Sequence, residues 1–82
     1  MDRNTILFNS NEKAELQTTE DILKAVYEAL DEKGYNAIDQ MVGYILSGDP
    51  SYITSYNNAR TMISRIDRDD LVEEILKNYL NK

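Results

Sequence analysis

The 82-residue chain contains no cysteine, no histidine and no tryptophan. Without cysteine, disulfide bonds, thiolate nucleophiles and cysteine-ligated metals are excluded. Without histidine, the chain lacks the commonest metal ligand and general base. Carboxylates, hydroxyls, lysine and arginine remain for chemistry, an inventory that is uncommon in an enzyme of this size. We therefore expect a protein without catalytic activity that uses neither a metal nor another cofactor.

The chain also lacks long apolar runs and an excess of positive charge. No run approaches the ~20 residues of a membrane-spanning helix, and residues 1–5 lack the regions of a signal peptide. A net charge of -6 argues against generic nucleic-acid binding, which requires lysine and arginine to neutralise phosphates. These absences predict a cytoplasmic protein that neither inserts into a membrane nor binds nucleic acid.

Positive charge is concentrated in one short segment. Residues 54–68 contain three arginines and a single acid, Asp67, in an otherwise acidic chain. Guanidinium groups bind carboxylates and phosphates through paired hydrogen bonds. The residues leave two alternatives open, a docking patch for an acidic or phosphorylated partner and ion pairs with Asp67, Asp69 or Glu73. The three arginines are Arg60, Arg65 and Arg68.

Apolar residues recur with the helical period of 3.6, and no strand-like alternation is visible. Thr18 or Thr19 begins the first helix, and Gly34 is suited to the left-handed residue that ends it. Asn36 begins a second helix and Gly48 ends it. The sequence predicts an all-α fold, a compact bundle of about five helices of which one is short, near residues 18–33, 36–47, 50–53, 57–66 and 67–82.

The second helix has almost no charge after Asp39, and a helix that is apolar nearly all round is buried on several sides. In a chain with so thin a core, this pattern favours a subunit interface and hence a homodimer. Glycine at position 43 lowers the stability of the helix by up to ~1 kcal/mol relative to alanine. A close helix–helix contact would offset this loss. The predicted dimer interface contains Met41, Gly43, Tyr44 and Tyr52.

The six tyrosines are many for this length. Tyrosine adds apolar area and a hydrogen-bonding tip, so it suits both a thin core and an interface. Tyr27 and Tyr79 lie on apolar stripes and are expected in the core, whereas Tyr44, Tyr52 and Tyr56 fit either place. The stripes expected to face inward are Ile38, Met41, Val42, Ile45 and Leu46 in the second helix, and Leu71, Val72, Ile75, Leu76, Tyr79 and Leu80 in the last.

Residues 1–17 show no sustained hydrophobic period, and their one apolar cluster runs from Thr5 to Phe8. Such a stretch buries too little apolar surface to offset the entropy of ordering it. We predict a flexible N-terminal tail over residues 1–17 and a helical domain over residues 18–82.

Two other motifs are weaker. Residues 36–47 and 57–67, on either side of a glycine-containing turn, suggest a helix-turn-helix protein that binds DNA. However, the connection is too long for that motif and the chain is acidic. The acidic run Asp67 to Asp70 lacks the spacing, the glycine and the terminal glutamate of a calcium loop.

The central part of the chain resembles the IreB/ReoM family of small regulatory phosphoproteins from low-GC Gram-positive bacteria. The resemblance covers about residues 20–81 without gaps. It is carried by Glu32-Lys33-Gly34-Tyr35-Asn36, Gln40, Val42-Gly43-Tyr44, Ser47-Gly48-Asp49-Pro50, Tyr52-Ile53, Ala59-Arg60, Arg68-Asp69, Glu73-Glu74 and Tyr79-Leu80.

The resemblance implies a helical homodimer that is phosphorylated by a Ser/Thr kinase with extracellular PASTA repeats and dephosphorylated by the matching phosphatase. The phosphorylated threonine maps to Thr5. The unphosphorylated protein would promote Clp-dependent turnover of UDP-N-acetylglucosamine enolpyruvyl transferase, and phosphorylation would relieve this. The switch would link envelope stress to peptidoglycan synthesis and cephalosporin resistance.

A phosphate adds about -1.5 to -2 charges near neutral pH. We expect a phosphorylated tail to dock on Arg60, Arg65 or Arg68 and to cover a partner site there. A helical adaptor that works without phosphorylation is the alternative.

Overall fold

The computed structural model describes residues 18–82 and contains, within them, four α-helices, two short 3-10 turns and no β-strand. The all-α prediction is confirmed, with four helices rather than five because residues 50–53 form only a 3-10 turn. The predicted tail, including Thr5, lies outside the described residues. The elements are α2 (Thr19–Glu32), α3 (Ala37–Ser47), η1 (Pro50–Tyr52), η2 (Tyr56–Asn58), α4 (Ala59–Ser64) and α5 (Arg68–Leu80).

Side-chain caps begin α2 and α3 where the sequence predicted them. The hydroxyl of Thr18 accepts a hydrogen bond from the backbone N–H of Asp21 at 3.1 Å. The side-chain oxygen of Asn36 accepts one from Asp39 at 3.2 Å. Each bond satisfies an N–H that has no partner within its helix. At the end of α3, Gly48 takes the left-handed conformation with a φ of 76°.

The connection from α3 to α4 is built from two tight turns. Asp49 caps η1 by accepting a hydrogen bond from the N–H of Ser51 at 2.9 Å, and Pro50 follows at the first position. Asn57 and Asn58 have φ values of 54° and 63°. Two successive left-handed residues cannot continue a right-handed helix, so the segment predicted over 57–66 is divided into η2 and the shorter α4.

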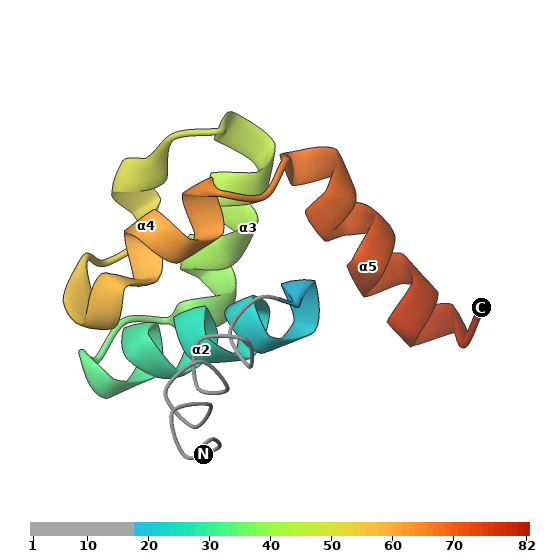
Figure 1. The fold of residues 1–82 in the computed structure, drawn as a ribbon. Coiled ribbons are helices and arrows are strands. Elements are labelled where there is room, and N and C mark those ends of the chain that lie inside the picture. Colours follow the sequence, from blue (N-terminus) through green and yellow to red (C-terminus); the bar gives the residue numbers. More distant parts are fainter. Residues whose placement is uncertain (1–17) are drawn as a thin grey trace, which may run out of the picture.

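The core is formed mainly by α2, α3 and α4, and α2 contacts both of the other helices as well as α5. Figure 1 shows these three helices packed into one body, from which α5 extends to one side. The largest fully buried side chains come from α2, the residue after η1, α4 and the first turn of α5. They are Val26, Leu30, Ile53, Ile63 and Leu71.

Helix α3 packs on this core with a different face from the one predicted. Tyr44 is only 6% exposed and Ala37 is buried with it, whereas the predicted inward residues Ile38, Val42 and Leu46 are exposed. Because α3 is apolar on several faces, its sequence pattern did not determine which face would meet α2 and α4. Met41 and Ile45 are partly buried against the core, as predicted.

The expectation that Tyr27 and Tyr79 lie in the core is wrong. Tyr27 is 43% exposed on α2, and Tyr79 is 83% exposed near the far end of α5. Tyr79 is exposed because α5 leaves the body after its first turn, so only Leu71 of its apolar stripe is fully buried. Val72 is partly buried, and the other residues of the stripe, Ile75, Leu76, Tyr79 and Leu80, form an exposed apolar face on α5.

Candidate functional site

The first of the predicted arginines, Arg60, holds the segment that follows η1. Its Nε donates a hydrogen bond to the backbone carbonyl of Ile53 at 2.8 Å, in a partly buried position. Ile53 is fully buried, so the bond fastens α4 to a residue fixed in the core.

Arg60 also lies close to Asp49. The pKa of the Asp49 carboxyl is below its ordinary value, first because it accepts hydrogen bonds from Ser51 and also because of the positive charge of Arg60. The Asp49 carboxyl lies in the turn that connects α3 to η1.

Arg68 approaches the same turn from α5. Its Nη1 donates a hydrogen bond to the backbone carbonyl of Ile45 at 3.0 Å. Its guanidinium carbon lies only 2.7 Å from the place that a Cβ would occupy on Gly48. Arg60 and Arg68, from two helices, thus bind backbone carbonyls on either side of the turn that contains Gly48 and Asp49. We name these two arginines and the segment from Ile45 to Ile53 the arginine junction.

Arg65 is not part of the arginine junction. It is exposed at the end of α4, and its side chain forms no ion pair or hydrogen bond with any residue in the described part of the chain. The ion pairs of residues 18–82 are Lys24–Glu20 and Lys77–Glu73, both between neighbouring turns of one helix. The alternative that the arginines pair with Asp67, Asp69 or Glu73 is therefore wrong.

The structural role of the two junction arginines was missed because their acceptors are backbone carbonyls, which no sequence pattern marks. A guanidinium carries five N–H donors. Arg60 uses Nε and Arg68 uses Nη1 within the fold, so each keeps donors that can bind an anion in pairs. The junction can thus hold the turn and still accept a phosphate or carboxylate.

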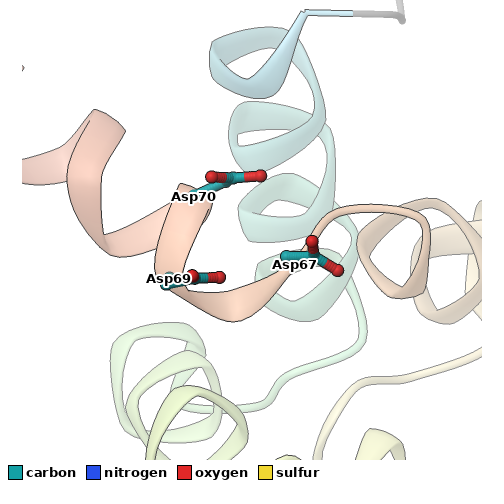
Figure 2. A group of neighbouring side chains, drawn as sticks. All are labelled: Asp67, Asp69 and Asp70. Carbon is teal, nitrogen blue, oxygen red and sulfur yellow. The ribbon is translucent and has the colours of Figure 1, made fainter.

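Three carboxylates, from residues next to Arg68 in the chain, lie close together at the start of α5 (Figure 2). The ligand atoms of Asp67, Asp69 and Asp70 are within 4.8 Å of one another, and all three residues are exposed. Acidic residues in a first turn are stabilised by the helix dipole, which accounts for Asp69 and Asp70. Their negative charge opposes an anion at Arg68, so Arg60 is the better receiver of a phosphate.

Two of the predicted interface residues, Gly43 and Tyr52, contact each other inside the subunit. The ring of Tyr52 lies against Gly43, with its Cδ1 2.6 Å from the place of a Cβ there. Tyr44 is buried in the core of the subunit. Tyr52 remains substantially exposed, and Met41 is partly buried. Within the subunit, the close contact at Gly43 is made by the ring of Tyr52.

A second cluster, which the sequence analysis did not identify, joins the end of α2 to η2. The Nζ of Lys33 lies 5.1 Å from the ring centre of Tyr56, a distance at which a cation is attracted to the ring face. A hydrogen bond to Glu32 raises the pKa of the Tyr56 hydroxyl, and the negative charge of Glu32 adds to the effect. Tyr56 therefore lies at the surface, fixed by α2, and not in the core.

A family model described as IreB regulatory phosphoprotein matches residues 3–81. The chain belongs to the IreB family. A relative from Ruminiclostridium cellulolyticum, called UPF0297 protein, is 57% identical over 76 residues, which make up 93% of this chain and 85% of the relative. Membership of the IreB family confirms the resemblance that the central motifs carried, and it supports a regulatory role. No helix in residues 18–82 is long and apolar enough to cross a membrane.

Proposed function

We propose that the protein is a non-enzymatic cytoplasmic regulator that a PASTA-type Ser/Thr kinase phosphorylates on Thr5. Unphosphorylated, it promotes Clp-dependent turnover of UDP-N-acetylglucosamine enolpyruvyl transferase, and phosphorylation relieves that turnover. The observation that carries the proposal is the match to a regulatory phosphoprotein family over residues 3–81, which include Thr5. The lack of histidine and cysteine favours a role without catalysis.

The kinase experiment tests the modified residue directly. The full chain is incubated with the cytoplasmic domain of the kinase, and intact mass and fragmentation locate the phosphate. We expect a single phosphate on Thr5 and none on the Thr5→Ala variant, while Thr54→Ala is modified like the parent. A phosphate found elsewhere in the Thr5→Ala variant would contradict the assignment.

A cellular experiment separates this proposal from a phosphorylation-independent adaptor. Thr5→Ala keeps the protein in its unphosphorylated form, so we expect a lower level of the transferase than in the parent strain. Deletion of the whole gene is expected to raise that level. If the Thr5→Ala strain and the parent hold equal amounts of transferase under envelope stress, the adaptor alternative is favoured.

Arg60 of the arginine junction is the proposed receiver of the phosphate. An extended chain between Thr5 and Thr18 can span up to ~45 Å, so length does not prevent the contact. The donors of Arg60 that the fold does not use form charge-assisted hydrogen bonds with phosphate oxygens. One carboxylate, Asp49, is affected by the charge of Arg60, whereas three belong to residues next to Arg68 in the chain.

Phosphorus NMR tests this docking without knowledge of the downstream partner. The second pKa of a phosphothreonine is near ~6, and a guanidinium that binds the dianion lowers it. We expect that pKa to be lower in the phosphorylated parent than in its Arg60→Ala variant, and equal in the parent and Arg65→Ala. Equal values in the parent and Arg60→Ala would exclude docking on Arg60.

We also infer that the protein is a homodimer in which a second copy covers the exposed apolar face of α5. Soluble monomers rarely expose a large contiguous apolar patch, and this helix exposes four large apolar residues on one face. Ile38, Val42 and Leu46 supply a second exposed stripe on α3. Light scattering is expected to give a mass near twice the 9.5 kDa of the chain.

A further inference from the structure

Arg68 occupies an unfavourable place for a cation in its own helix. It is the first residue of α5, whose first turn is otherwise acidic. A helix N-terminus carries a partial positive charge, which stabilises acids there and disfavours bases. The presence of arginine at this position therefore requires an explanation outside α5.

That explanation lies at the end of α3. The last turn of α3 contains no basic residue, although its free carbonyls carry a partial negative charge that a cation stabilises. Arg68 supplies this cation from another helix, because its Nη1 donates to the carbonyl of Ile45 at 3.0 Å. A charge that is unfavourable for α5 is thus favourable for α3.

Gly48 makes room for this contact. A Cβ at residue 48 would lie 2.7 Å from the guanidinium carbon of Arg68 and 2.9 Å from its Nη2. Real side chains essentially never approach so closely, so the guanidinium occupies space that only glycine leaves free. Gly48, which ends α3, therefore also provides the space that the Arg68 guanidinium occupies.

Apart from this hydrogen bond, few contacts attach α5 to the body formed by α2, α3 and α4. Leu71 is its only fully buried residue, and Figure 1 shows the helix extending away from α2, α3 and α4 toward the C-terminus. A single buried side chain near one end leaves a helix free to pivot, whereas a second contact one turn away restricts the pivot. The hydrogen bond from Arg68 to Ile45 is such a contact.

We propose that Arg68 is a positioning residue that fixes the direction of α5 by capping the C-terminus of α3. The direction of α5 in turn determines where its exposed apolar face points. This role requires neither a phosphate nor a partner. It can therefore be tested independently of phosphorylation at Thr5 and of the docking of a phosphate on Arg60.

Distances between spin labels on α2 and α5 test the proposal. The chain has no cysteine, so Glu28→Cys and Asn78→Cys can be labelled without side reactions. Labelled full-length chain is diluted with an excess of unlabelled protein, so that only distances within one chain are measured. We expect one narrow distance peak for otherwise unchanged protein.

In the same background, Arg68→Ala is expected to shift or broaden that peak. Arg65→Ala, which changes an arginine with no side-chain hydrogen bond or ion pair to residues 18–82, is expected to leave it unchanged. Arg68→Gln keeps most of the side-chain stem but not the charge, and it should also broaden the peak. Circular dichroism shows whether each variant keeps its helices. If Arg68→Gln folds and its peak coincides with that of the unchanged protein, Leu71 alone directs α5 and the proposal is wrong.

Discussion

The aromatic ring of Tyr52 lies against α3 at Gly43. A Cβ on residue 43 would be 2.6 Å from Cδ1 and 3.0 Å from Cζ of that ring. Tyr52 is held in place by its backbone, because its carbonyl accepts a hydrogen bond from the side chain of Gln40 at 2.9 Å. The glycine in the middle of α3 therefore allows η1 to pack against the helix.

The Gly43→Ala substitution separates two opposing effects. Alanine favours the helix by up to ~1 kcal/mol, but its methyl group overlaps the Tyr52 ring, and overpacking of this kind costs typically ~1–3 kcal/mol. We expect a net loss of about 1 kcal/mol in the free energy of unfolding, measured by urea titration.

The same change in a Tyr52→Ala background provides the control. With the ring removed, only the helix preference remains, so Gly43→Ala is expected to stabilise the protein. The sign of the effect should thus reverse between the two backgrounds, and the difference is the coupling between the two positions. An effect of the same sign and size in both would show that the ring moves aside without cost.

The N-caps of α2 and α3 give a second prediction. Asn36→Ala removes the hydrogen bond to the N–H of Asp39, and loss of such a cap costs typically ~1 kcal/mol. We expect a decrease of that size in the free energy of unfolding, and a similar one for Thr18→Ala. Asp67 is a natural comparison because it begins α5 without a side-chain hydrogen bond.

Asp67→Ala is therefore expected to cost less than Asn36→Ala at high salt, where the attraction of the Asp67 charge to the helix dipole is screened. A loss at Asp67 as large as that at Asn36 under these conditions would show that the cap bond is not the source of the stability.

The sequence predicted what depends on near neighbours in the chain. Thr18 and Asn36 cap helices through bonds to residues three positions away. Gly48 ends α3 as predicted, and Asp49 and Pro50 begin η1 through interactions of the same local kind. Such local interactions depend only on residue types at a fixed spacing in the chain. They can therefore be predicted before the fold is known.

What the sequence did not predict depends on which surfaces meet. The apolar pattern of α3 fits several faces, and only packing selects the one with Tyr44. The pattern of α5 predicts a buried stripe but not that the helix leaves the body after Leu71. The arginine junction depends on backbone carbonyls of Ile45 and Ile53, which lie 23 residues from Arg68 and 7 residues from Arg60 in the chain, at spacings that mark no local motif.

Asp49 gives a pH-dependent prediction. Hydrogen bonds from Ser51, and to a smaller extent the charge of Arg60, lower the pKa of Asp49 from its ordinary value of 3.8. A carboxyl with a lowered pKa in the folded state stabilises the fold above its unfolded pKa. That contribution is lost as the pH falls through the folded pKa.

Asp49→Asn keeps an acceptor for the N–H of Ser51 but does not titrate. The difference in unfolding free energy between the parent and this variant is therefore expected to be constant from pH 7 to about pH 5. Below the ordinary pKa of the carboxyl it should change in favour of the variant. A difference that stays constant down to pH 2 would show that the pKa of Asp49 is the same in both states.

The exposed apolar face of α5 gives the last prediction, which concerns the proposed homodimer. Leu76 is about half exposed, so Leu76→Glu places a charge on that face with little effect on the core of the subunit. In a dimer that buries this face, the unpaired charge would be desolvated at a cost of several kcal/mol. Light scattering at tens of micromolar is expected to show a mass half that of the parent, and the melting temperature should no longer depend on protein concentration.

Tyr27→Glu, which adds the same charge to an exposed position on α2, is expected to leave both the mass and the melting behaviour as in the parent. A parent protein that is monomeric under these conditions, or a Leu76→Glu variant that keeps the parent mass, would place the apolar face of α5 outside any subunit interface.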